Sequence, residues 1–431
     1  MRDSIAGLTP RGRAVTGAGV ALVALAWLLG QRDLLRVAVL ALALPLIAAA
    51  LISRTRFRLT SSRGVASRRV ALGDSTVSLV RVTNSSRLPM GTLLVSDRVP
   101  ELLGESPHRV IGRLSPGERC DISTALHGSA RGQYAVGPLS LTLRDPFGLC
   151  EVSRSFTTTD RVVVTPRVID LPGNGLAGLW GGRGDSEART IAHSGDDDVI
   201  PREYRTGDEI RRVHWRATAR TGDLMVRREE QPWHTTATLV LDRRASSHRG
   251  RFPDTSLELA ISIAASAAIH LSRLGLRVRV LDTTGEVLAD SGLGMDAEAL
   301  ILDGLALVDS AGHGVLVDSA PLRRALDDGT LVAILGHLEP RDARLLADLR
   351  GVRGVAAALV VDAGAWDVDV AEQGGPESTA AILRRHGWRS AIVSPDRDSA
   401  AAADRITHTD QRIEQAWAHL SSAAVGSAVM R

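Results

Sequence analysis

Two long apolar runs lie near the beginning of the chain, at residues 14–30 and 37–53, and neither contains a charged residue. As helices they are each about 26 Å long, close to the roughly 30 Å of a bilayer's hydrocarbon core. Pro45 interrupts the second run, and membrane helices tolerate such a proline. A cleaved signal peptide is the competing interpretation, but no small-residue cleavage site follows the first run and the second begins almost at once. A buried hairpin of a soluble protein is the other alternative. The pattern predicts a two-helix transmembrane hairpin over residues 1–54.

Arginines flank both runs and predict the orientation of the hairpin. Three precede the first run and four follow the second, whereas the connecting loop contains Arg32, Asp33 and Arg36. The positive-inside rule then places both termini in the cytoplasm, so we expect a cell-membrane protein with a cytoplasmic body. The flanking residues are Arg2, Arg11, Arg13, Arg54, Arg56, Arg58 and Arg63.

Short runs with partial alternation of apolar and polar residues recur over residues 57–165, separated by turns rich in Gly, Pro, Asn and Asp. Regular short strands with such punctuation indicate an antiparallel β-sandwich, here over residues 55–166. The expected strands are residues 76–82, 92–95, 121–126, 139–143 and 161–164. Within this region, residues 145–149 (Asp-Pro-Phe-Gly-Leu) predict a tight turn with one aromatic anchor.

A Gly-rich linker and a dense charged motif follow, together at residues 167–234. Four arginines face nearby carboxylates, an arrangement that suits bidentate pairing. We expect a compact ion-pair cluster with Trp215 as its apolar anchor and turns at residues 207–208 and 222–223. The paired residues are Arg202, Arg211, Arg220 and Arg227 with Glu203, Asp208, Asp223 and Glu229.

The same segment offers weaker candidates for chemistry. His214 could act as a base, and residues 196–198 (Asp-Asp-Asp) could bind a cation. No serine or cysteine stands at a spacing that indicates a nucleophile for His214, and no ligand spacing of a known cation loop follows the aspartates. The motif therefore favours a structural core and partner surface, with a hydrolytic enzyme as the alternative.

From residue 236 onward, buried strands alternate with helices, which predicts a doubly wound parallel α/β domain over residues 235–431. A capping box at residues 255–258 starts the longest helix, which we expect to end near Leu274. The final segment, residues 410–425, places Ile413, Trp417 and Leu420 on one helical face and predicts docking onto its own domain. The remaining expected strands are residues 238–242, 276–282, 331–335, 356–361 and 390–393, and the helices 296–308, 320–327, 340–349 and 378–385.

Composition adds three constraints. All 52 basic residues are arginines, and 49 carboxylates leave a net charge of only +3, less imbalance than a strongly basic nucleic-acid binder shows. The arginine usage indicates a GC-rich genome. Two cysteines, Cys120 and Cys150, exclude a disulfide-dense scaffold and a four-cysteine zinc site.

The charged motif, preceded by Arg-Gly-Gln-Tyr at residues 131–134 and by the turn at residues 145–149, resembles the bacterial domain-of-unknown-function family fifty-eight. His214 is a departure, since the family more often has Asp there. The resemblance extends over nearly the whole chain. The matching residues are Arg202, Glu203, Tyr204, Gly207, Asp208, Arg211, Trp215, Ala217, Ala219, Arg220, Gly222 and Leu224.

The resemblance implies a C-terminal domain similar to von Willebrand A-type domains, which often bind a divalent metal through Asp-x-Ser-x-Ser after the first strand. Here Asp242 and Ser246 fit that pattern, but Arg244 replaces the first serine. A guanidinium there would repel a cation and could pair with Asp242 instead, so no metal or other cofactor is expected. The resemblance also implies a MoxR-type AAA+ ATPase as partner, and often a transglutaminase-like membrane protein.

Together these features predict a membrane-anchored, non-enzymatic adaptor in a chaperone-like or envelope-assembly system. The hydrolytic enzyme that uses His214 and nearby carboxylates remains one alternative. A metal-dependent adhesion-type binding protein that uses Asp242 is the other.

Overall fold

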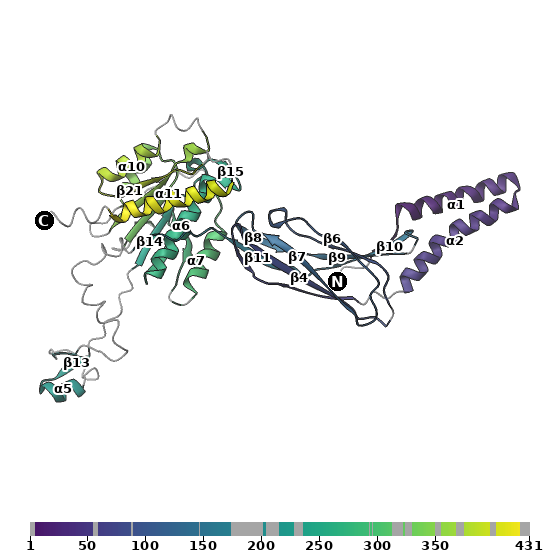
Figure 1. Ribbon diagram of the computed structural model, residues 1–431, viewed down its shortest axis with the longest axis horizontal. Coiled ribbons are helices and arrows are strands. Elements are labelled where there is room, and N and C mark those ends of the chain that lie inside the picture. The colour runs from purple at the N-terminus through teal and green to yellow at the C-terminus, as the bar shows by residue number, and fades with distance from the viewer. Residues whose placement is uncertain are drawn as a thin grey trace. The chain divides into compact units, whose positions relative to one another are not determined.

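The computed structural model describes residues 5–54, 59–87, 89–145, 147–173, 201–203, 215–227, 236–292, 294, 296–312, 322–323, 330–349, 355–367, 375–396 and 402–422. The chain divides into two compact units, Met1–Arg167 and Val168–Arg431. Figure 1 shows the elements of both units.

The first unit begins with a strand that the hydrophobic pattern does not reveal. β1 (Ile5–Leu8) pairs antiparallel with β10 (Cys150–Phe156), so residues directly before the first helix belong to a β-sheet. The four-residue strand is too short for a period of two to stand out, and its partner lies far along the chain.

Both apolar runs are helical, and the helices pack side by side (Figure 1). α1 (Pro10–Leu29) is capped by Thr9, whose Oγ1 accepts a hydrogen bond from the Gly12 N–H, and α2 (Arg32–Arg54) contains Pro45. The connecting loop is shorter than expected, because α2 already begins at Arg32. Both helices are long and apolar enough to cross a membrane.

Short strands follow α2, as the alternating pattern predicts. β4 alternates buried and exposed residues along nearly its whole length, and it pairs with β2 and β7. Two further sheets have the orders β1-β10-β9-β5-β6 and β3-β11-β8. The strands are β2 (Leu59–Val65), β3 (Arg69–Ala71), β4 (Ser75–Asn84), β5 (Leu93–Asp97), β6 (His108–Ile111), β7 (Arg119–His127), β8 (Gly132–Val136), β9 (Leu139–Arg144) and β11 (Asp160–Thr165).

One hydrophobic core joins two of these sheets. Val80 and Ile122, from β4 and β7, belong to the same buried cluster as Leu93 and Leu141, from β5 and β9. The strand pairing is not purely antiparallel, however, because β3 and β11 pair in parallel. These two strands meet through a long-range contact that no local pattern specifies.

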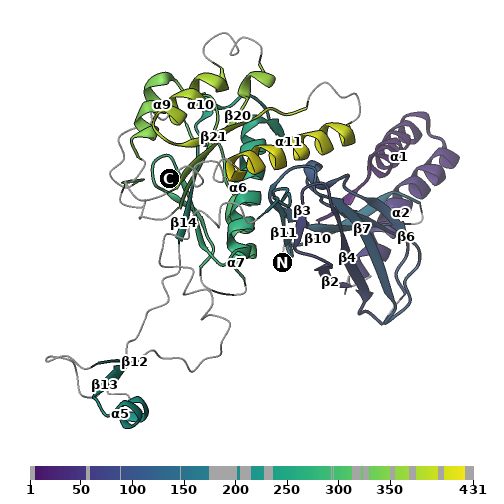
Figure 2. The ribbon, with the colours of Figure 1, turned by 60° about the vertical axis from the view of Figure 1, so that its left-hand side comes forward.

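The second unit contains one six-stranded sheet with the order β18-β17-β14-β19-β20-β21 (Figure 2). Five strands are parallel, and β18 adds an antiparallel edge through a hairpin with β17. The expected alternation of strands and helices is thus present. The strands are β14 (Thr236–Leu241), β17 (Arg277–Asp282), β18 (Val287–Asp290), β19 (Thr330–Leu335), β20 (Ala356–Val361) and β21 (Arg389–Val393).

Helices cover both faces of this sheet, because alternate residues of each strand point to opposite sides. Leu239 and Leu241 of β14 lie in one core with α6 (Ser256–Arg273), α7 (Ala297–Ala306) and α11 (Ala402–Ser422). Val240 lies in a second core with α9 (Pro340–Ala347) and α10 (Pro376–Arg385).

Helix α6 confirms the predicted cap, since the Thr255 Oγ1 accepts from the Glu258 N–H at 3.1 Å. Helix α11 begins at Ala402, earlier than its apolar stripe suggests, and its residues Ile413, Trp417 and Leu420 are each 1% exposed. The tail therefore docks onto its own unit as expected. The helix expected at residues 320–327 falls mainly outside the described residues.

Candidate functional site

The order of the strands reverses direction at β14, between β17 and β19, and ligands of open α/β sheets bind outside the carboxyl ends of strands at such a point. The loop after β14 carries residues 242–248 there. The backbone N–H of Asp242 donates to the Ile334 carbonyl of β19 at 2.9 Å. The carboxyl edge of β14 is therefore the candidate ligand site of this sheet.

The guanidinium of Arg244 lies at this edge and pairs with two carboxylates. Its Nε donates to Oδ1 of Asp242 and its Nη2 donates to Oδ2 of Asp242, both at 2.9 Å. Its Nη1 donates to Oδ2 of Asp342 at 2.7 Å. The side chains of Arg244, Asp242 and Asp342 are 6%, 0% and 13% exposed. The pairing with Asp242 agrees with the sequence expectation. Asp342 belongs to α9, a hundred residues away, and no local signal could have identified it.

The guanidinium stays charged in this buried position. Burial alone would lower the pKa of Arg244, but the hydrogen bonds to Asp242 and Asp342 outweigh burial and raise the pKa above its ordinary value. Three of the guanidinium's donors thus satisfy two carboxylates in the planar geometry that arginine favours. We call Arg244, Asp242 and Asp342 the arginine lock.

The loop that carries the lock is held against β19. The Ser247 carbonyl accepts from the His337 N–H at 2.8 Å. Gly336 makes this approach possible, because a Cβ at that position would lie 2.2 Å from the Ser247 oxygen. A glycine directly after a central parallel strand is the one sequence signal that could have indicated this close contact.

His248 and Ser256 form a buried imidazole–hydroxyl pair that the sequence reasoning missed. The Nε2 of His248 donates to the Asp242 carbonyl at 2.6 Å, so its Nδ1 accepts from the Ser256 hydroxyl at 3.0 Å. Burial lowers the pKa of His248, which favours this neutral form. Ser256 is 0% exposed, so the pair supports the loop rather than offering a nucleophile to a substrate.

Asp282, at the carboxyl end of β17, is also satisfied within the protein. Its Oδ2 accepts from Arg243 Nε at 3.0 Å, and its Oδ1 accepts from the backbone and hydroxyl of Thr284. Burial would raise the pKa of this carboxyl, but the hydrogen bonds from Thr284 and Arg243 lower it. The carboxylates of Asp242, Asp342 and Asp282 thus face arginines rather than an open site.

The two residues of the expected metal pattern differ in environment. Asp242 is buried beneath Arg244, whereas Ser246 lies on the exposed surface of a short 3-10 helix, Ala245–Ser247. Among the described residues, no group of three or more His, Cys, Asp or Glu side chains is placed to hold a metal ion.

The charged motif is described only in part. β12 (Pro201–Glu203) pairs with β13 (Met225–Arg227), and α5 (Trp215–Thr221) lies between them in sequence. Glu203 pairs with Met225 and Arg202 with Val226 in the strand register. Tyr204, Gly207, Asp208, Arg211 and His214 fall outside the described residues, as do residues 196–198.

Trp215 is not a buried anchor in this structure. Its side chain is 67% exposed, and Ala219 and Arg220 are exposed on the same short helix. Among the described residues of the motif, a seven-residue helix and two three-residue strands offer too little surface to bury an indole. The turn expected at Gly222 is present, with a φ of 83° that suits glycine.

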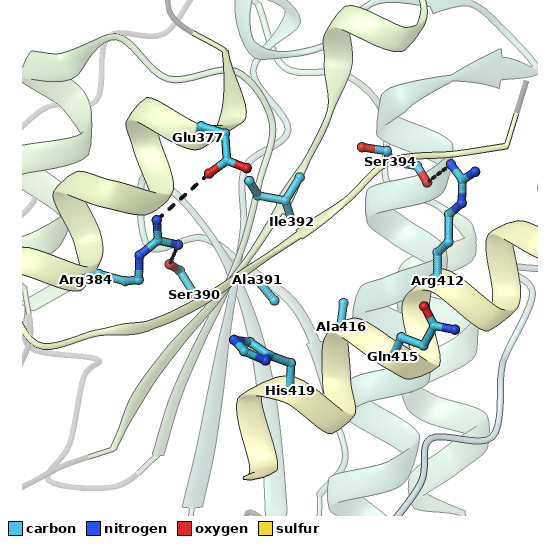
Figure 3. A pocket seen from close by; sticks show the side chains of 10 residues that line it. All are labelled: Glu377, Arg384, Ser390, Ala391, Ile392, Ser394, Arg412, Gln415, Ala416 and His419. Carbon is cyan, nitrogen blue, oxygen red and sulfur yellow. Dashed lines mark hydrogen bonds and ion pairs between the residues drawn. The ribbon is translucent and has the colours of Figure 1, made fainter. Parts of the chain in front are cut away.

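A second polar region is open rather than closed. A groove of about 530 Å³ follows β21, the edge strand of the sheet, between α10 and α11 (Figure 3). The Val393 carbonyl faces β20, where it accepts from the Asp362 N–H. Because backbone groups alternate in direction along a strand, those of Ser390 and Ile392 face the groove. The lining residues are Glu377, Arg384, Ser390, Ala391, Ile392, Ser394, Arg412, Gln415, Ala416 and His419.

The groove carries more basic than acidic side chains. Arg384 donates to the Ser390 hydroxyl at 3.3 Å and lies 3.9 Å from Glu377, the one carboxylate in the lining. On the other wall, Arg412 donates to the Ser394 carbonyl at 3.2 Å and lies 3.9 Å from Asp396, and His419 points toward the same space (Figure 3). The groove therefore combines an edge strand with two guanidinium groups, each of which has one carboxylate at 3.9 Å.

The solved structures similar to parts of this chain are glycosidases with low TM-scores. A β-glucosidase, EmGH1, from Erythrobacter marinus is 10% identical at a TM-score of 0.16, over 25% of this chain and 15% of that one. A β-glucosidase from Listeria innocua is 12% identical at a TM-score of 0.14, over 25% and 16%. A β-glucuronidase from Parabacteroides merdae is 10% identical at a TM-score of 0.17, over 83% and 38%. This chain thus spans less than a fifth of the length of either β-glucosidase.

No curated protein matches the chain. A protein-family model matches residues 201–301, which include the charged motif and the start of the α/β unit. The matching family is described as "Protein of unknown function DUF58", and this segment supports the chain's membership of that family.

Proposed function

We propose that the chain is a membrane-anchored, non-enzymatic adaptor whose α/β unit binds a partner protein, a MoxR-type AAA+ ATPase being the partner that the family resemblance implies. We interpret the first unit as a β-sandwich, because β4, β7, β5 and β9 share one core. We interpret the second as von Willebrand A-like, on its strand order and antiparallel edge strand β18.

The arginine lock is the observation that carries the proposal. A ligand or divalent cation at the carboxyl edge would have to displace Arg244 from both Asp242 and Asp342. Breaking a buried ion pair by removing one partner leaves an uncompensated buried charge and costs about 3–5 kcal/mol. Recognition by this unit is therefore independent of a bound metal.

Anchoring follows from the hairpin. β1 precedes α1 and β2 follows α2, and both strands belong to sheets of the first unit, so the hairpin returns to the side from which it starts. Arginines flank its base, and the positive-inside rule then places the body in the cytoplasm. Protease treatment of spheroplasts from outside would leave the body intact, whereas digestion of the body would overturn this orientation.

The groove along β21 is the surface that we assign to the partner. The outer backbone groups of an edge strand bind an extended segment as an added strand. Arg384, Arg412 and His419 favour a segment that carries carboxylates. The occupant is therefore an extended acidic segment of the partner.

Co-purification tests the adaptor. The tagged full-length chain is solubilised from membranes that also contain the MoxR-type ATPase, and an unrelated two-span membrane protein with the same tag is the control bait. We expect the ATPase with the chain and not with the control. Failure to recover it with the chain would contradict the proposal.

Calorimetric titration of the full-length chain with Mg²⁺ or Mn²⁺ tests the metal-dependent alternative. We expect no micromolar binding of either cation, because both carboxylate oxygens of Asp242 accept hydrogen bonds from Arg244. Micromolar binding that is lost in Asp242→Ala would contradict the proposal and favour a metal-dependent binder.

A further inference from the structure

A turn whose described residues are Asp145, Phe147, Gly148 and Leu149 lies against the base of the helical hairpin. The Leu149 carbonyl accepts from the Thr9 N–H at 2.9 Å, and the Gly148 carbonyl accepts from the Thr9 hydroxyl at 2.6 Å. The contact is so close that a Cβ on Gly12 would lie 2.1 Å from the Leu149 oxygen. The turn is therefore fixed to the first turn of α1.

Asp145 makes the turn rigid. Its carboxylate is buried and accepts from the backbone N–H groups of Phe147 at 2.9 Å and Cys150 at 2.6 Å. Gly148 adopts a φ of 67° and donates to the Asp145 carbonyl at 3.0 Å. This geometry places Phe147 outward, with 58% of its surface exposed.

The residue after Gly148 has the opposite environment. Leu149 is 4% exposed in a small core with Val152 of β10 and with Leu44 and Ala48 of α2. A hydrogen bond from the Cys150 thiol to the Pro45 carbonyl, at 3.6 Å, belongs to the same contact. The aromatic side chain next to this apolar contact is thus left open at the point where the hairpin meets the sheet.

The length of α2 indicates what covers Phe147. The contacts with β10 begin at Leu44, and the stretch from Arg32 to Leu44 is about 20 Å long at 1.5 Å per residue. Val37 and Leu40 in this stretch are 54% and 67% exposed. A hydrocarbon core is about 30 Å thick, so the free part of α2 is about 10 Å too short.

The shortfall is removed if the hydrocarbon core also covers α2 beyond Leu44, where Leu46 and Ile47 are 70% and 55% exposed. The attached turn then lies at the boundary with the headgroup layer. Arg11 and Arg13, both exposed in the first turn of α1, would then meet anionic headgroups. Phe147 is exposed in the turn that Thr9 binds, and an exposed aromatic side chain is typical of the boundary between headgroups and acyl chains.

We propose that the turn formed by Asp145, Phe147, Gly148 and Leu149 is a membrane-interface element, with Phe147 inserted at the boundary between lipid headgroups and acyl chains. The inference rests on the membrane anchor proposed above and adds a second, β-sheet-borne contact with the lipid surface. This contact fixes the height of the first unit above the bilayer.

Spin-label accessibility tests the inference. Full-length chain carrying Cys120→Ser, Cys150→Ala and Phe147→Cys is labelled with a nitroxide and reconstituted in vesicles of phosphatidylethanolamine and phosphatidylglycerol. We expect the label to collide more with oxygen than with a water-soluble nickel complex, at a depth near the phosphates. The opposite preference, as found in solution, would overturn the inference.

Two reference positions make the result interpretable. Leu40→Cys reports the middle of the hairpin and is expected to lie deep in the bilayer. Val77→Cys replaces a residue that is 42% exposed on β4, and we expect its label to lie in water. Val77 lies beyond Val80, which pairs with Arg63 of β2. Arg63 binds Asp97 of β5, and Asp97 pairs with the end of β9 that is opposite the turn.

The reference at Leu40 separates the two proposals. If Leu40→Cys is also water-accessible, the hairpin does not enter the membrane and the proposed anchor fails. If Leu40→Cys is deep but Phe147→Cys behaves like Val77→Cys, the anchor stands and the interface element is overturned.

A second measurement keeps both native cysteines. Phe147 or Val77 is replaced by photoreactive benzoyl-phenylalanine in the full-length chain, in the same vesicles. We expect phospholipid adducts from position 147 and none from position 77. Equal adduct yields at the two positions would overturn the inference.

Discussion

The carboxyl edge around Arg244 and the groove along β21 lie on the same sheet and contain the same kinds of side chain. At the carboxyl edge, one guanidinium faces two carboxylates in a buried position, and the three side chains satisfy each other. In the groove, Arg384 and Arg412 contact a hydroxyl and a backbone carbonyl, and Glu377 lies at 3.9 Å. Burial makes the charged groups of the lock part of the core, whereas the guanidinium groups of the groove stay about half exposed beside Glu377 and Asp396 and can meet a partner.

Removing the lock's cation should have the largest effect. Arg244→Met leaves Asp242 buried and unpaired, and we expect a loss of about 3–5 kcal/mol in the free energy of unfolding of the second unit. Urea denaturation followed by the fluorescence of the buried Trp388 and Trp417 measures the loss. Arg384→Met is the control from the groove and should change stability by less than about 1 kcal/mol. Equal losses would contradict the distinction between the two regions.

Crowding the loop that carries the lock should have a smaller effect. Gly336→Ala places a Cβ 2.2 Å from the Ser247 oxygen, and overpacking against backbone costs about 1–3 kcal/mol. Gly312→Ala is the matched control, because no atom lies within 4 Å of its added Cβ. The same denaturation experiment compares them. A Gly336→Ala variant as stable as Gly312→Ala would show that the loop is not clamped to β19.

Acid should weaken the carboxyl edge through His248. Burial lowers the pKa of this imidazole in the folded state, so the unfolded chain binds the proton more readily. The contribution is complete above the ordinary histidine pKa of about 6.5 and is lost as the pH falls below it. We expect the free energy of unfolding to fall between about pH 6.5 and 5, and less steeply in His248→Gln. Identical slopes in the two chains would exclude His248 as a cause.

Adding one charge to the groove should affect binding more than stability. Gln415→Glu places a carboxylate in the lining, while Gln411→Glu places the same charge one turn earlier on α11, outside it. Like charges near a surface repel by about 1 kcal/mol, which is about fivefold in affinity. We expect recovery of the ATPase with the chain to fall for Gln415→Glu only. An equal fall for both variants would place the acidic segment elsewhere.

Local signals predicted much of the fold. The helix N-cap at Thr255 and the apolar stripe of Ile413, Trp417 and Leu420 depend on residues within a few positions of each other, and both are confirmed. Strand β1 was missed because its pairing with β10 joins residues about 145 positions apart. The burial expected for Trp215 was wrong because the pattern of charges says nothing about how much surface surrounds the indole.

The sequence by itself determined the two apolar helices, the change from short alternating strands to alternating strands and helices, and the arginine that stands beside Asp242. These features depend on residues close together in the chain, where periodicity and spacing are informative. Only the tertiary fold brings Asp342 to the lock, joins Gly148 and Leu149 to the base of the hairpin, and makes β21 the last strand of the described six-stranded sheet. Each of these depends on contacts between distant segments, which the packing of the sheets brings together and no local pattern encodes.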